Sequence, residues 1–244
     1  MRKKKRIFKL VFKRKIFLSQ HSFRGPDLLF ERLCYLQAEE EALREGHVVV
    51  EEEEKVVAMA GIAMVLGLGF DAVTEAAVLE KVPDFLLPEW KHKKFASYWA
   101  PLVMDLKTAL VGFEPEDLQN TFLEAVQQNP LYGHIWFYVY KFEEGGVIPA
   151  AVSALLPREL LLGFNQEGVT LFTWGHKPLY KIGYADMQSW KGSSTQVSLT
   201  VVDTAHSPEP FTLALLTSQG RAIMSVIVDY NRACIAEAEL TAGR

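Results

Sequence analysis

The feature that most constrains the fold of this chain is a change of hydrophobic period within residues 117–140. In the first half of this stretch, apolar residues recur at three- and four-residue spacing, which is typical of one face of a helix. Asn129-Pro130 ends that helix, because proline lacks an amide hydrogen and disfavours a helical conformation in the residue before it. After Gly133 the apolar residues alternate, as in a half-buried strand. The two halves of the chain therefore follow different folding patterns.

The sequence before this joint predicts helices. A leucine-rich stripe follows Pro26-Asp27 and ends at Gly46. The carboxylates of Glu51–Glu54 suit the positive end of a helix whose apolar residues, continuing to about Leu66, predict burial at the centre of a bundle. A short helix is predicted over 71–81, followed by a turn between Pro83 and Pro88. A longer helix is predicted over 89–111, with Phe95 and Tyr98 towards the core and a kink at Pro101. A last helix is predicted from Pro115 into the joint.

The sequence after the joint predicts short strands at regular spacing, followed by one helix. Small residues between Gly145 and Pro157 predict a loop. The predicted strands are 134–140, 159–164, 169–174, 179–183, 187–190, 196–202 and 211–216, and the terminal helix is 218–238. This pattern indicates a small barrel or sandwich that follows an all-helical lobe, so the fold class is α+β.

Charge is distributed unevenly along the chain. Residues 1–24 contain ten Lys and Arg and no acidic residue, which leaves the rest of the chain with 16 Lys and Arg against 30 Asp and Glu, a formal charge of −14. A basic end on an acidic body can contact an anionic surface such as lipid or a polymer, and a solvated strand face with a free terminus is the alternative. For the basic cluster at 91–94 the alternative is an exposed helix face. The candidate contact residues are Lys3, Lys4, Lys5, Lys13, Arg14, Lys15, Lys91, Lys93 and Lys94.

Nothing in the sequence nominates catalytic chemistry. The chain has no HExxH, GxSxG or P-loop motif, and Cys34 and Cys234 lie too far apart to form a metal-binding pair, so we expect neither an enzyme nor a cofactor. The segment Gly67–Ala72 matches the G-x-G-x-x-A variant of the dinucleotide fingerprint, but the residues before it are typical of a helix, and a glycine-mediated helix stop is the alternative. An acidic body without a basic aromatic platform argues against nucleic-acid binding.

The segment Ile7–Phe17 alternates apolar and basic residues and predicts one or two strands. Such strands are not stable alone and need partners, which the following helices do not supply. The chain is therefore expected to begin near the end of a module whose earlier part is missing.

Four segments carry a resemblance to a known family. They read LVFKRKIFL at Leu10–Leu18, PDLLFERLCYLQ at Pro26–Gln37, NPLYGHIWFYV at Asn129–Val139 and LLLGFNQEGVTLF at Leu160–Phe172. In that order they are similar to the final strand of the first lobe, the opening helix of the second lobe, the inter-lobe joint and the first hairpin of the third lobe of a FERM domain. Within this family the chain looks most like the MyTH4-FERM tails of unconventional myosins and plant-type calmodulin-binding kinesins.

The resemblance implies an architecture and its boundaries. Residues 1–18 would be the terminal strand or strands of a mostly missing ubiquitin-like first lobe. Residues 19–130 would form an acyl-CoA-binding-protein-like helical bundle. Residues 131–244 would form a PH/PTB-like seven-stranded barrel that is capped by the C-terminal helix.

The resemblance also implies a binding function. A partner peptide would lie along the fifth strand of the third lobe, against the terminal helix, where an edge strand offers unpaired backbone groups. Trp190 would be the main anchor, because aromatic residues often anchor interfaces. On this chain the groove would comprise Met187, Gln188, Ser189, Trp190, Lys191, Ile223, Val226, Ile227 and Tyr230, although the helix residues also suit core packing.

The partners implied by the resemblance are proteins: the cytoplasmic tail of a cargo or receptor, and a cytoskeletal motor or filament. An anionic membrane surface would be a further partner, so the expected location is cytoplasmic, cytoskeleton-associated and peripheral at the membrane. A fixed structural docking component of a cytoskeletal or microtubule-based assembly is the alternative function.

Overall fold

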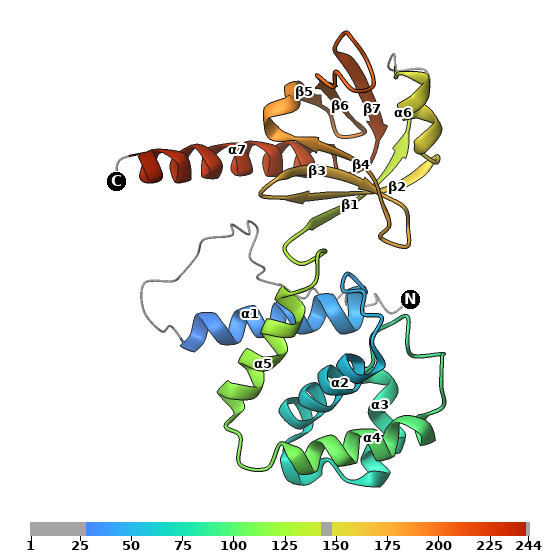
Figure 1. Cartoon of the computed structure of the whole chain (residues 1–244), viewed down its shortest axis with the longest axis vertical. Coiled ribbons are helices and arrows are strands. Elements are labelled where there is room, and N and C mark those ends of the chain that lie inside the picture. The colour runs from blue at the N-terminus through green and yellow to red at the C-terminus, as the bar shows by residue number, and fades with distance from the viewer. Residues whose placement is uncertain (1–27, 143–147, 243–244) are drawn as a thin grey trace, which may run out of the picture.

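The computed structural model describes residues 28–142 and 148–242, with side chains described up to residue 236 in the last helix. The chain forms a helical lobe and a β lobe, which one short connection joins (Figure 1). Each lobe has its own apolar core. The predicted α+β order, helices first and strands second, is confirmed. The predicted strand within residues 1–18 lies outside the described residues.

The helical lobe is built around one apolar helix. Its helices are α1 (Leu28–Glu40), which continues as a π-helical turn (Glu41–Glu45), α2 (Glu53–Leu68), a 3-10 turn (Phe70–Ala72), α3 (Glu75–Phe85), α4 (Ala96–Ala109) and α5 (Pro115–Gln127). Helix α2 is buried over most of its length and contacts α3, α4 and α5, as its all-round apolar sequence predicted. Because Gly67 lies inside α2, the helix-stop interpretation of Gly67–Ala72 is confirmed and the dinucleotide fingerprint is wrong.

Two helix predictions in this lobe are wrong. Helix α3 continues through Pro83, where a turn was expected. The helix predicted from residue 89 begins only at Ala96, so Phe95 is 87% exposed and does not face the core. The reason is that Glu89 and Trp90 hold the preceding loop: a Glu89 carboxylate oxygen accepts from the Val50 amide at 3.1 Å, and the Trp90 indole donates to the Val50 carbonyl at 2.8 Å. Tyr98, also expected in the core, is exposed.

The β lobe is one antiparallel sheet of seven strands. The strands are β1 (Ile135–Lys141), β2 (Glu159–Asn165), β3 (Gly168–Phe172), β4 (Pro178–Gly183), β5 (Met187–Gly192), β6 (Gln196–Val201) and β7 (Phe211–Leu216). Their order in the sheet is β4-β3-β2-β1-β7-β6-β5, which leaves β4 and β5 at its ends. The last helix, α7 (Gly220–Ala242), packs across the sheet and runs out beyond it (Figure 1). A short helix, α6 (Ala150–Leu155), occupies part of the segment predicted as a loop.

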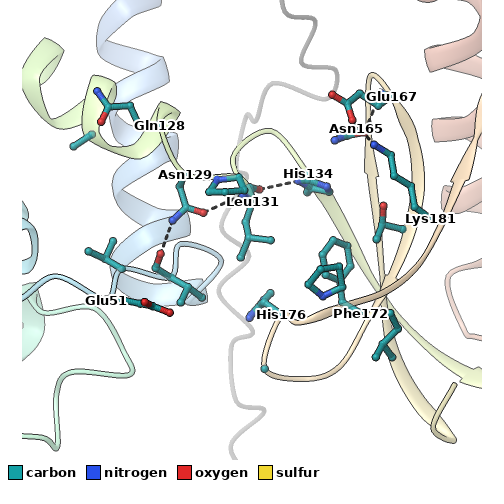
Figure 2. Close-up of a pocket in the computed structure, with 18 of the residues that line it drawn as sticks. Glu51, Gln128, Asn129, Leu131, His134, Asn165, Glu167, Phe172, His176 and Lys181 are labelled. Atoms are coloured by element: carbon teal, nitrogen blue, oxygen red, sulfur yellow. Dashed lines mark hydrogen bonds and ion pairs between the residues drawn. The ribbon is translucent and has the colours of Figure 1, made fainter. Parts of the chain in front are cut away.

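The connection between the lobes is fixed by Asn129. Its side-chain amide donates to the Val49 carbonyl at 2.5 Å, while its side-chain oxygen accepts from the Leu131 amide at 3.0 Å. The Leu131 carbonyl in turn lies 3.0 Å from Nδ1 of His134, just before β1 (Figure 2). Gly133 has a φ of 76°, which suits glycine. These bonds direct the chain from the end of α5 into β1.

Aromatic and imidazole rings from both lobes meet beside this connection. Trp136 on β1 lies 5.4 Å from His47 of the helical lobe and 5.0 Å from His176 of the β3–β4 turn, between ring centroids. The His47 and His176 rings are 5.7 Å apart. His134 stacks on Trp136 at 5.2 Å and is buried, so it is a packed residue. We call these four residues the joint cluster.

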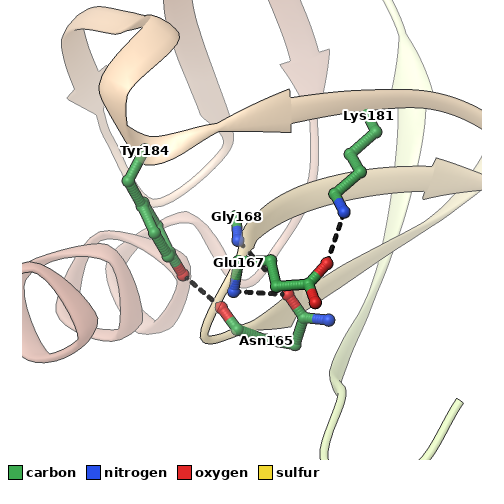
Figure 3. Close-up of polar contacts among 5 residues, drawn as sticks. All are labelled: Asn165, Glu167, Gly168, Lys181 and Tyr184. Carbon is green, nitrogen blue, oxygen red and sulfur yellow. Dashed lines mark hydrogen bonds and ion pairs between the residues drawn. The ribbon is translucent and has the colours of Figure 1, made fainter. Parts of the chain in front are cut away.

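The turn between β2 and β3 places a glycine where other residues do not fit (Figure 3). The Asn165 side-chain oxygen accepts from the amides of Glu167 and Gly168, which closes the turn, and Lys181 on β4 pairs with Glu167. Gly168 has a φ of 150°, and a Cβ there would lie 2.1 Å from the Ile182 carbonyl oxygen. The strand β4 can therefore approach this closely only because residue 168 is glycine.

We predict that Gly168→Ala destabilises the β lobe by about 1–3 kcal/mol, because the new methyl group forces β3 and β4 apart. Gly175→Ala is the matched control, since a Cβ there would meet only the Thr173 hydroxyl at 3.8 Å. Urea unfolding of both variants measures the difference. Equal stability of the two variants would contradict the strained approach at residue 168.

The joint cluster also predicts a pH dependence. Burial lowers the pKa of His176 below its ordinary value of 6.5, and the nearby His47 and His134 lower it further. Burial likewise lowers the pKa of His134, and the charge of Lys181 lowers it further. Hydrogen bonds to Leu131 and Tyr132 and the charge of Glu167 raise this pKa, but burial is the largest effect. Below about pH 6.5 the unfolded chain therefore binds more protons than the folded chain, and stability falls as the pH falls.

We expect His176→Gln to lose less unfolding free energy than the wild-type chain between about pH 7 and pH 5, because one depressed imidazole pKa has been removed. The exposed His92 provides the control substitution, His92→Gln. Urea unfolding at both pH values measures the loss. Identical losses in the wild-type chain and in His176→Gln would argue against a neutral, buried imidazole at the joint.

Candidate binding surfaces

The first candidate surface is the free edge of β5, where the peptide groove was predicted. Among the described strands β5 pairs only with β6, so one side of its backbone has no strand partner. The register between the two strands shifts between Met187 and Ser189, which makes Gln188 the extra residue of a β-bulge. Gln188 and Lys191 are exposed, and Ser189 is half-buried.

The bulge turns Trp190 towards the interior of the barrel. Trp190 lies opposite Leu199, a fully buried residue of the core, and paired residues of antiparallel strands point to the same face. Its indole is half-buried and packs on the margin of the core. Met187 lies opposite Val201 and is buried in the same way. Trp190 therefore lies at the edge of the sheet with its indole against the core.

The predicted groove residues of α7 do not line an open surface. They are 0–2% exposed and belong to the core of the β lobe, where they close the barrel; they are Ile223, Val226, Ile227 and Tyr230. The half-buried Met224 lies nearest to β5 instead, because a Cβ on Gly192 would be only 2.4 Å from its Cγ. The structure thus brings together Trp190, Gly192 and Met224 at this edge. The helical period of α7 could not show which flank of the helix faces β5.

The second candidate surface is the basic segment between α3 and α4. Lys91, Lys93 and Lys94 lie in turns and not on the exposed helix face that was the alternative interpretation. The Lys93 ammonium lies 3.5 Å from the centroid of Trp90, and the Lys94 ammonium lies 4.5 Å from that of Tyr98. The exposed Phe95 follows directly. The basic residues predicted between Lys3 and Lys15 lie outside the described residues.

A third candidate surface, which the sequence did not indicate, is a cleft between the lobes (Figure 2). Its volume is about 840 Å³. Glu51 and Gln128 line it from the helical lobe, and Phe172, His176 and Lys181 line it from the β lobe. The walls come from segments more than 100 residues apart in the chain, such as 49–55 and 165–181, which only the tertiary structure brings together.

The charges in this cleft are largely paired with one another. Lys181 pairs with Glu167, which lowers the pKa of that carboxyl group, and Lys55 pairs with Glu52 at 3.1 Å. The Nε2 atom of His176 is buried without a hydrogen-bond partner among the described residues. The cleft is lined more by apolar than by polar atoms and has no concentrated charge of one sign.

A smaller cavity of about 470 Å³ lies between β4 and the β6–β7 loop. Here the Tyr180 hydroxyl donates to Oδ2 of Asp203 at 2.5 Å, and Nδ1 of His206 lies 2.7 Å from the same oxygen. Burial and the adjacent Asp203 raise the pKa of Tyr180, while the hydrogen bond from Tyr180 lowers the pKa of Asp203. These contacts connect β4 to the β6–β7 loop.

Neither metal chemistry nor a membrane span is indicated by the described residues. In residues 28–142 and 148–242, no group of three or more His, Cys, Asp or Glu side chains is arranged to hold a metal ion. None of the helices in this part of the chain combines the length and apolar character needed to cross a bilayer.

Comparisons with known proteins place these observations in a family. Residues 27–137 match the model of the FERM central domain. A comparison with curated protein sequences finds no match. Similar solved structures are therefore informative about the fold.

Two of these structures are myosin tails. A mutant MyTH4-FERM MF2 domain of Dictyostelium discoideum myosin VII shares 18% identity with a TM-score of 0.69, covering 91% of this chain and 44% of that chain. The C-terminal MyTH4-FERM domain of human myosin 7b, solved in complex with the harmonin-a PDZ3 domain, shares 20% identity with a TM-score of 0.70, covering 90% and 42%. The chain thus spans less than half the length of these neighbours.

A third structure is the complex of the FERM and C-terminal domains of Drosophila Merlin, with 11% identity and a TM-score of 0.62, covering 88% of this chain and 68% of that chain. Its similarity extends over both lobes, as does that of the myosin domains. Residues 27–137 therefore match a FERM central domain, and the described chain as a whole has the fold of the helical and C-terminal lobes of a FERM domain.

Proposed function

We propose that this chain binds the cytoplasmic tail of a cargo or receptor at the β5 edge and connects it to the cytoskeleton, as part of a motor tail. The observation that supports this proposal is the free edge of β5, which carries the half-buried Trp190. A fixed docking component of a cytoskeletal or microtubule-based assembly is the alternative. In either case the expected location is cytoplasmic and cytoskeleton-associated.

The β5 edge suits an extended peptide. Its unpaired backbone groups can form main-chain hydrogen bonds with an added strand, which supply affinity for any sequence. Trp190 adds sequence preference, because a partly exposed indole at an interface can anchor an apolar side chain. The core residues of α7 hold the helix in place beside this edge, where Met224 packs against Gly192.

Similarity to the myosin tails supports the motor branch of the proposal. The human myosin 7b domain was solved with a PDZ domain of harmonin-a, so a domain of this fold can bind a protein partner. For this chain the partner is a proposal, since the identity is 20% and the shared region is 42% of the myosin chain.

We predict that peptides selected from a random-peptide display library on the wild-type chain bind Trp190→Ala roughly tenfold or more weakly, because the anchor has been removed. The same peptides should shift the amide resonances of residues 187–192 in nuclear magnetic resonance spectra. The control is Phe113→Ala, which removes an exposed aromatic side chain of the helical lobe.

The urea midpoint of Trp190→Ala shows whether the variant is folded, and the exposed Lys191→Glu tests the same edge without disturbing the core. Selected peptides that bind both variants as tightly as the wild-type chain, or that shift resonances elsewhere, would reject the β5 groove.

A second candidate function is contact with an anionic membrane surface. The observation that favours it is the 87% exposed Phe95 directly after Lys91, Lys93 and Lys94. Neighbouring acidic groups have other partners: Glu89 accepts from the Val50 amide, and Glu53 accepts from the Tyr98 hydroxyl at 2.5 Å. An apolar ring among lysines can insert at the lipid interface while the ammonium groups contact anionic headgroups.

We predict that the chain binds vesicles containing phosphatidylserine and that replacing Lys91, Lys93 and Lys94 by Gln weakens binding by up to roughly a hundredfold, at about 1 kcal/mol per lysine. Phe95→Ser should weaken binding as well, whereas Phe113→Ser provides the matched control. Vesicle sedimentation measures the binding. Equal binding of the triple variant and the wild-type chain would exclude this surface.

A further inference from the structure

The sheet of the β lobe has a second apolar layer on its outer face. Leu161 on β2 lies opposite Tyr138 on β1 and opposite Phe172 on β3. Neither Leu161 nor Phe172 belongs to the core cluster of the barrel, yet each is only 3% exposed. Both are therefore covered from the outside. This explains why β2 and β3 lack the alternation of buried and exposed residues that a one-sided sheet shows.

The rings that cover this layer come from β1 and from the β3–β4 turn. Trp136 packs on Phe172, with 4.9 Å between ring centroids. Tyr138 stacks on Trp174, with centroids 4.9 Å apart and an angle of 22° between the planes. Because Trp136 also contacts His47, one end of the layer is the inter-lobe interface.

The other end of the layer has no cover among the described residues. Tyr138 is 53% exposed, Tyr140 44% and Trp174 51%. We call these three residues the outer aromatic patch. It is continuous with the inter-lobe interface through the Trp136–Phe172 contact, and it is separate from the β5 edge. A surface of several half-exposed aromatic residues is characteristic of interaction sites.

The geometry of the patch limits what can bind there. An added strand finds no free edge at Tyr140, because this residue is paired with Glu159 on β2 and with Leu216 on β7. Neither the inter-lobe cleft nor the cavity at β4 has Tyr138, Tyr140 or Trp174 in its lining, so the patch belongs to neither of them. Its half-exposed rings suit a peptide whose backbone needs no strand partner and whose side chains lie flat on aromatic rings.

A polyproline II segment meets these conditions. Its proline rings pack against aromatic side chains, and its backbone carbonyls have no internal hydrogen bonds and can accept from Tyr hydroxyl and Trp indole donors. The exposed carboxylate of Glu159, opposite Tyr140, favours a basic residue beside the prolines. We propose that the outer aromatic patch binds a proline-rich segment with a flanking basic residue.

The test uses an oligoproline peptide that ends in arginine, titrated into the complete chain and followed by calorimetry and by amide resonance shifts. We expect binding with shifts at residues 136–140 and 172–176, and a loss of roughly tenfold or more in Trp174→Ala. Tyr140→Ser provides a second exposed substitution should Trp174→Ala fold poorly. Glu159→Lys should weaken binding of the arginine-ended peptide by roughly threefold or more. Trp190→Ala should bind this peptide as tightly as the wild-type chain does, which separates this patch from the β5 edge.

Three results would overturn the proposal. They are no binding of the oligoproline peptide, equal binding of a peptide in which the prolines are replaced by glycine, and unchanged binding in both Trp174→Ala and Tyr140→Ser. Concentration-dependent self-association in analytical ultracentrifugation that Trp174→Ala abolishes would instead assign the patch to a second copy of the chain.

Discussion

The arrangement of this molecule depends on the contact that the joint makes with the loop before α2. Asn129 bonds to the Val49 carbonyl with its amide group and to the Leu131 amide with its oxygen, so one side chain both fixes the turn after α5 and ties the joint to the loop before α2. Trp136 then meets His47 across the interface. Because rings of this size pack in few arrangements, the two lobes are held in a defined orientation, and the cleft of about 840 Å³ beside them follows from that orientation.

The β lobe offers its partners three chemically different surfaces. The β5 edge offers backbone groups and one half-buried indole, which suits an extended peptide. The outer face of β1 offers aromatic rings and not a strand edge, which suits a peptide segment that already has a defined conformation, such as polyproline II. In the inter-lobe cleft, Lys55 pairs with Glu52 and Lys181 pairs with Glu167, so charges of opposite sign lie side by side. The FERM central domain adds the exposed Phe95 among lysines, so a membrane surface and a peptide could be bound at different lobes.

The sequence predicted what is encoded locally. The change of period at the joint, the buried centre of α2, and the strands from 135 to 216 follow from residue spacing, and the structure confirms them. The start of α4 was missed, because it is decided by two hydrogen bonds with Val50, some 40 residues away: the Val50 amide donates to Glu89, and the Trp90 indole donates to the Val50 carbonyl. The buried positions of Ile223, Val226, Ile227 and Tyr230 were foreseen as an alternative, but their helical period could not separate core from groove. The joint cluster and the outer aromatic patch depend on tertiary pairing that no local pattern shows.

The claim that the lobes are locked by the joint cluster is tested most directly by a double-mutant cycle between His47 and Trp136. The unfolding free energies of His47→Ala, Trp136→Ala and the double variant give the coupling between the two rings. A contact across the lobe interface predicts a coupling of about 0.5–1.5 kcal/mol. Effects that add to within about 0.3 kcal/mol would show that the two rings do not interact, and would contradict a fixed arrangement of the lobes at this joint.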